Sequence, residues 1–150
     1  MQRIENAINW VLRLNANMLL NLSERVNRWA RRPNEKKLAL VPERLREHVK
    51  AIYGNDQKSR EASLEAFEKT PHPSLLPHLV DFYTIDSRLA LDSEVLGPLL
   101  RRLSQENYDE ALKLFSKRAE ETPLLTKVAA YALHREGDNQ AIPLLARLLK

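Results

Sequence analysis

The sequence is poor in the residues that build most cofactor sites. Its 150 residues include no cysteine and only three glycines, and aromatic residues make up 6% of the chain. Without cysteine, the chain has no disulfide scaffold, cysteine-based zinc site, iron–sulfur cluster or thiol catalysis. Gly54, Gly97 and Gly137 stand far apart, whereas a phosphate-binding loop needs several glycines close together. We therefore expect no nucleotide or other cofactor.

Long apolar runs are also missing. No stretch approaches the roughly 18 uncharged apolar residues that a membrane span needs. The longest candidate near the start, residues 14–23, contains three asparagines. The first residues lack the apolar run and small-residue cleavage site of a signal peptide. These features predict a cytoplasmic protein, and the lack of cysteine fits a reducing compartment.

What the chain has in abundance favours α-helix. There are 27 Leu and 15 Ala, against 16 Val, Ile and Thr together. From Ile4 to Trp29 an apolar residue recurs every three or four positions, so one apolar stripe stays aligned along a helix. Pro33 would end this helix. We predict a single all-α domain over residues 1–150, made of a long amphipathic basic helix at 1–32 and a helical-repeat body at 38–150.

Turn and capping residues divide that body into shorter helices. We expect helices from residue 38 or 42 to 53, over 58–69 and over 74–83, and a fourth that follows Asp92 as its N-cap and runs to about residue 103. A fifth begins at Asn107, where the spacing to Glu110 matches a capping box. A sixth begins at Thr122 and Pro123. A turn at Gly137 separates it from the last helix. Residues 79–85 are the only plausible strand, but a lone strand has no partner.

Three proline-containing segments repeat one pattern. Residues 76–80, 97–100 and 142–145 each place an apolar or small residue before proline and apolar residues after it. Residues 122–150 read as a complete helical hairpin whose first helix carries Ala129, Ala130 and Ala132. This hairpin resembles a HEAT-type repeat of α-solenoids, and the likeness extends loosely from residue 73. Residues 107–115 are also similar to the start of a tetratricopeptide helix.

The resemblance implies a fold and a mode of action. It implies a right-handed stack of antiparallel helical hairpins. HEAT-like and tetratricopeptide-like proteins are mostly scaffolds that present a groove to a protein, a peptide or a nucleic acid, and a minority are enzymes.

Candidate catalytic and metal-binding residues are scattered. The histidines His48, His72, His78 and His134 span 86 residues. His78 and Asp81 are three residues apart and could supply two metal ligands, but we interpret them as a polar pair on a helix surface. His134 is explained by the end of a helix. We predict no catalytic, cofactor or metal site.

The formal charge of +4 is unevenly distributed. Residues 1–60 carry 13 basic and 6 acidic residues, a balance of +7, and residues 61–150 carry 11 and 14, a balance of −3. The basic segment continues from the long helix through Arg46, Lys58 and Arg60. Its candidate contact residues are Arg25, Arg28, Arg31, Arg32, Lys36, Lys37, Arg44 and Lys50. Three interpretations stay open: a solvated surface that complements a helix C-terminus, a phosphate-backbone contact on DNA or RNA, or contact with an acidic protein surface, including that of another copy.

Two apolar surfaces are candidate protein interfaces. The first surface lies on the long helix and comprises Ile4, Ile8, Trp10, Val11 and Met18. The second lies on the last helix and comprises Leu144 and Leu148. The last helix is apolar around much of its circumference, so it is either tucked between neighbouring helices or packed on a partner chain. Six asparagines weaken the case for the long helix lying on a membrane.

Two functional hypotheses follow. The first is a non-catalytic helical-repeat interaction module, a subunit or adaptor in a larger assembly that binds a protein partner or a second copy. The alternative is a sequence-nonspecific nucleic-acid-binding subunit that uses the basic N-terminal segment.

Overall fold

The described part of the protein is all-α. The computed structural model describes residues 32–135, 139 and 141–148, and residues 33–150 form one compact unit. The predicted long helix at 1–32 falls outside the described residues except for Arg32. The α-helices are α2 (Glu35–Ala39), α3 (Glu43–Tyr53), α4 (Gln57–Lys69), α5 (Leu76–Ile85), α6 (Ser87–Asp92), α7 (Leu96–Glu106), α8 (Tyr108–Arg118), α9 (Pro123–Leu133) and α10 (Ile142–Leu148). Two 3₁₀ turns, η1 (Pro73–Leu75) and η2 (Ala119–Glu121), precede α5 and follow α8.

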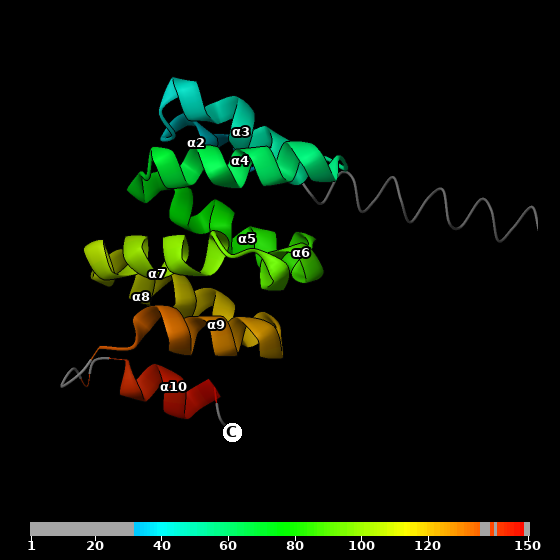
Figure 1. The fold of residues 1–150 in the computed structure, drawn as a ribbon. Coiled ribbons are helices and arrows are strands. Elements are labelled where there is room, and N and C mark those ends of the chain that lie inside the picture. Colours follow the sequence, from blue (N-terminus) through cyan, green and yellow to red (C-terminus); the bar gives the residue numbers. More distant parts are fainter. Residues whose placement is uncertain (1–31, 136–138, 140, 149–150) are drawn as a thin grey trace, which may run out of the picture. The chain divides into compact units, whose positions relative to one another are not determined.

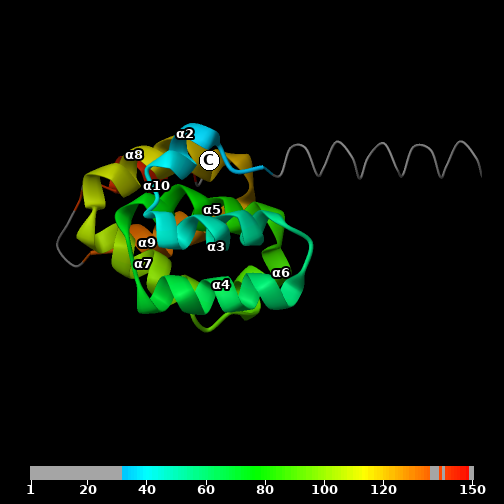
Figure 2. The same cartoon turned by 90° about the horizontal axis from the view of Figure 1, so that it is seen from above.

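The helices of this unit lie in successive layers that follow the chain order (Figure 1). Helix α3 packs on α4, α5 on α7, α7 on α8 and α9, and α9 on α10. Seen from above, α2, α5 and α8 lie toward one side of the unit, and α4 and α7 lie toward the other (Figure 2). None of the described helices is long and apolar enough to cross a membrane.

A continuous apolar core runs through the layers. Its largest fully buried side chains include Phe67 of α4, Phe82 of α5 and Phe115 of α8. Leu79 and Leu100 are also fully buried and belong to the same core cluster. Burying each such side chain contributes roughly 1.5–3 kcal/mol, so the successive layers share one source of stability.

Polar caps and prolines set several helix ends where the sequence places them. The Asp56 carboxylate accepts a hydrogen bond from the Ser59 amide at 2.9 Å and begins α4. The Thr122 hydroxyl accepts from the Leu125 amide at 3.2 Å and begins α9, with Pro123 as the first helical residue. Helix α9 ends at Leu133, with His134 as its C-cap. The predictions for Thr122 and for His134 are confirmed.

Other predicted boundaries are wrong. Residues 87–92 form α6, so Asp92 ends a helix instead of capping the next one. The hydroxyl of Ser93 accepts from the amides of Val95 and Leu96 at the start of α7. Residue Asn107 does precede α8, but its side-chain amide donates to the Leu103 carbonyl at 3.0 Å, so the predicted capping box does not form.

The last helix is partly explained by the unit's own core. Leu144, which we assigned to a protein interface, is 6% exposed and packs in the unit's own core. Ile142, at the start of α10, is 53% exposed. The Leu148 side chain lies outside what the structure describes. Arg147 ties α10 to the preceding layer through Glu120 at 2.7 Å and the Ser116 carbonyl at 2.9 Å.

The N-cap of α9 can be tested by substitution. We expect Thr122→Ala to lower the free energy of unfolding by about 1 kcal/mol, because the Leu125 amide loses its partner. The matched control is Thr84→Ala, which removes an exposed hydroxyl bound to the Asp81 carbonyl within α5 and should change stability by less than about 0.5 kcal/mol. Urea unfolding followed by circular dichroism measures both. Equal effects of the two substitutions would contradict the capping role.

Candidate functional site

The candidate site is an open groove lined by residues of α2, of the segment that leads into α5 and of α8. These three helices lie toward one side of the unit in Figure 2. The volume of the groove is about 1050 Å³. Helix α2 contributes Lys37 and the following residue Leu40. The segment that leads into α5 contributes residues 72–74, Leu76 and Pro77, and the α8 side contributes Asn107, Glu110, residues 112–114, Ser116 and Lys117.

The middle of the groove is apolar. Leu40 is 72% exposed, the most exposed of the large hydrophobic residues that the structure describes. Leu76 is almost fully buried, so it forms floor instead of rim. Leu114 is half-buried against the core, and Pro73 and Pro77 complete the apolar lining. An exposed leucine beside a concave apolar surface is typical of a surface that a partner covers.

The rim is polar and carries more positive than negative charge. Lys113 and Lys117 are four residues apart on α8, so they share one helix face. The Lys113 ammonium pairs with the Glu110 carboxylate at 3.0 Å, and both side chains are exposed. Among the described residues no carboxylate pairs with Lys37 or Lys117.

A half-buried polar network fixes the two walls of the groove. Asp81 of α5 accepts a hydrogen bond from the Tyr53 hydroxyl of α3 through one oxygen and pairs with Arg118 of α8 through the other. Arg118 continues to Glu121, with Nε to Oε1 at 2.6 Å and Nη2 to Oε2 at 3.0 Å. The Asp81–Arg118 pair thus joins α5 to α8, and Tyr53 joins both to α3.

His78 is the buried end of this network. Its Nδ1 lies 2.9 Å from the Tyr53 hydroxyl oxygen. Because the hydroxyl proton is donated to Asp81, that oxygen accepts from an Nδ1–H of His78. The other ring nitrogen, Nε2, has no hydrogen-bond partner among the described residues. Burial lowers the pKa of His78, and it raises the pKa of Tyr53, whose hydroxyl therefore stays protonated.

The interpretation of His78 and Asp81 as a surface pair is therefore wrong. His78 is fully buried, since it lies on the same face of α5 as Leu79 and Phe82. Among the described residues no three His, Asp or Glu side chains converge as metal ligands would. The network serves to hold helices together.

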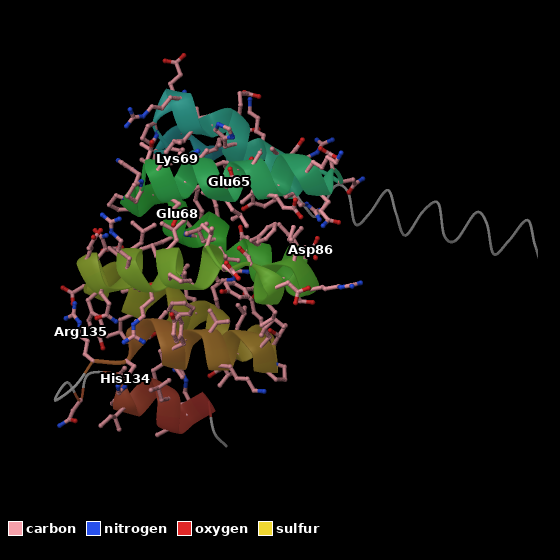
Figure 3. All side chains as sticks on the ribbon, viewed as in Figure 1. Glu65, Glu68, Lys69, Asp86, His134 and Arg135 are labelled. Atoms are coloured by element: carbon pink, nitrogen blue, oxygen red, sulfur yellow. The ribbon has the colours of Figure 1, made fainter. Side chains whose placement is uncertain are left out.

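A second buried ion pair neutralises a residue that we assigned to the basic segment. Arg60 of α4 is 6% exposed and pairs with Asp86 at 2.5 Å, and it also donates to the Gly54 carbonyl. Asp86, labelled in Figure 3, caps α6 by accepting from the Leu89 amide at 3.0 Å. Arg60 is thus a structural residue and contributes no free positive charge at the surface.

Few of the predicted contact residues meet at the groove. Arg25, Arg28, Arg31, Ile4, Ile8, Trp10, Val11 and Met18 lie outside the described residues. Arg32, Lys36, Arg44 and Lys50 are exposed, and Lys50 pairs with Glu47 at 2.6 Å. Only Lys37 lines the groove. Sequence reasoning missed Leu40, Lys113 and Lys117, although the spacing of the two lysines already placed them on one face.

Comparisons with known proteins gave no significant match. No family model, no curated protein sequence and no solved structure significantly matches this chain.

The network predicts a specific cost for removing one hydroxyl group. Tyr53→Phe leaves the Nδ1–H of His78 without an acceptor and removes one of the two donors to Asp81, so we expect the free energy of unfolding to fall by about 1–3 kcal/mol. The matched control, Tyr131→Phe, alters a tyrosine that is 46% exposed and should cost less than about 0.5 kcal/mol. Chemical denaturation of both variants measures the difference. Equal losses would show that the network contributes nothing.

His78 also predicts a pH dependence of stability. Because burial lowers its pKa below the ordinary value of 6.5, the unfolded chain binds a proton at this residue more readily than the folded chain. The Asp81 charge and the Lys37 main chain oppose this lowering of the pKa of His78, and the Lys37 charge adds to it. The free energy of unfolding should therefore fall as the pH drops from about 7.5 to about 5.5. The free energy of unfolding, measured by denaturation at several pH values in this range, should depend less on pH for His78→Gln than for the original protein. Parallel pH profiles for the two proteins would contradict the assignment.

Proposed function

We propose that this chain is a non-catalytic helical-repeat interaction module, a subunit or adaptor that holds a segment of a partner protein in the groove between α2, α5 and α8. The observation that carries the proposal is the exposed Leu40 beside a concave apolar floor. A rim of lysines around such a floor can hold a polypeptide by both burial and charge. The partner is a different protein or a second copy, and the absence of cysteine fits a cytoplasmic setting.

A HEAT-like architecture is part of the proposal. Pro77, Pro98 and Pro143 each stand at the second or third residue of a helix, in α5, α7 and α10. The layers follow one another in chain order, as stacked hairpins would. Both features support a right-handed stack of antiparallel hairpins, in which helices facing one side present a shared binding surface.

The second candidate is sequence-nonspecific binding of nucleic acid by the basic N-terminal segment. Lys36 and Arg44 support it, because both are exposed and neither pairs with a carboxylate among the described residues. Such contacts to phosphates would be sequence-tolerant and strongly dependent on salt.

The groove predicts that one exposed leucine decides peptide binding. We expect the full chain to select binding peptides from a displayed library of random linear peptides. Leu40→Asp should lower the affinity for these peptides by about tenfold or more, because a carboxylate would replace apolar contact area. The matched control is Leu91→Asp, at a leucine that is 63% exposed and lies outside the groove. Fluorescence anisotropy measures both affinities.

Two outcomes would contradict the leading proposal. One is equal weakening by both leucine substitutions, which would remove the groove as the binding surface. The other is tight binding to single- or double-stranded DNA or RNA that falls steeply with salt and is lost when Arg28, Arg31 and Arg32 are reversed to glutamate. That result would establish the second candidate instead.

A further inference from the structure

Charged side chains of this protein differ in whether a carboxylate faces them. The half-buried Arg118 and the buried Arg60 are neutralised by Asp81, Glu121 and Asp86. Removing a carboxylate from such a pair would destabilise the fold, because a buried charge without a partner is costly. Among the described residues, Lys37 and Lys117 have no carboxylate partner.

The acidic residue at the rim, Glu110, does not cancel the excess of positive charge there. Glu110 pairs with Lys113, but the two side chains are 74% and 73% exposed, so solvent screens the pair. The acidic residue at the rim thus offsets one lysine of three. A groove with this composition has a positive rim over an apolar floor.

We propose that the groove binds an acidic amphipathic segment of a partner protein. Its apolar side chains would cover Leu40, Leu76 and Leu114, and its carboxylates would lie beside Lys37, Lys113 and Lys117. This inference rests on the proposed function, since it names the partner chemistry of the same groove. Charge complementarity at the rim sets specificity and attracts the segment, and burial of the apolar floor supplies most of the affinity.

The same observations favour a polypeptide over a nucleic acid in this groove. No Phe, Tyr or Trp is present among the described residues that line it. Its one aromatic ring, the half-buried imidazole of His72, is held by the Ser74 hydroxyl at 2.7 Å, so the groove lacks the row of aromatic side chains on which successive bases stack. The apolar side chains of Leu40 and Leu76 would instead contact apolar side chains of a polypeptide.

The test is a selection from a displayed library of random linear peptides with the full chain, followed by affinity measurements at several salt concentrations. We expect selected peptides to carry apolar residues and more Asp and Glu than Lys and Arg. Reversal of Lys113 and Lys117 to glutamate should weaken these peptides by about tenfold, since two attractive contacts become repulsive. The matched control reverses Lys58 and Lys127, two exposed lysines outside the groove, and should change affinity by less than about twofold.

The possible results separate the two proposals. Acidic peptides that depend on Lys113, Lys117 and Leu40 support both. Neutral or basic peptides that depend on Leu40, with no effect of the lysine reversal, overturn the acidic partner and leave the groove as a protein-binding site. Peptides unaffected by Leu40→Asp overturn both. Single-stranded RNA that competes with the peptides for the groove, and binds more tightly than they do, overturns the choice of a polypeptide.

Discussion

The Asp81 carboxylate is the interaction on which the arrangement of this groove depends. It joins three helices that are far apart in sequence, through the hydroxyl of Tyr53 and the guanidinium of Arg118. A half-buried carboxylate is stable only where such donors compensate for its lost hydration. The requirement works in both directions, because Tyr53 and Arg118 also need an acceptor. The position of α8 against α5, and with it the width of the groove, is therefore fixed by chemistry inside the unit.

Much of the helical structure could be predicted from the sequence, because helix ends depend on nearby residues. Thr122 and Pro123 begin α9, and an aspartate at 56 begins α4, since a side-chain oxygen three residues away suffices for each cap. Helix α6 escaped prediction although its N-cap is just as local, because Asp86 accepts from the Leu89 amide three residues later. The sequence does not reveal that Arg60 of α4, 26 residues earlier in the chain, pairs with Asp86.

The candidate site was much less predictable, because it depends on contacts between distant segments. Lys37 and Lys117 lie at one groove although 80 positions separate them in the sequence. The same limitation explains His78. A histidine three residues before an aspartate looks like a surface pair until the burial of Leu79 and Phe82 fixes which face of α5 points inward. Charge balance along the chain identified a basic N-terminal segment but could not distinguish Arg60, which is buried and paired, from Lys37.

This separation of paired and unpaired charges bears directly on function. If rim lysines were needed for stability, evolution toward a new partner would endanger the fold each time they changed. Here the ion pairs that hold the helices are buried or half-buried, whereas Lys113 and Lys117 at the rim are exposed and Lys37 is half-buried. Walls tied by Asp81 and Arg118 also reduce the ordering that binding requires, so more of the interaction energy is available as affinity. If the proposed function holds, a pre-formed groove with an independent rim can change its partner without changing its fold.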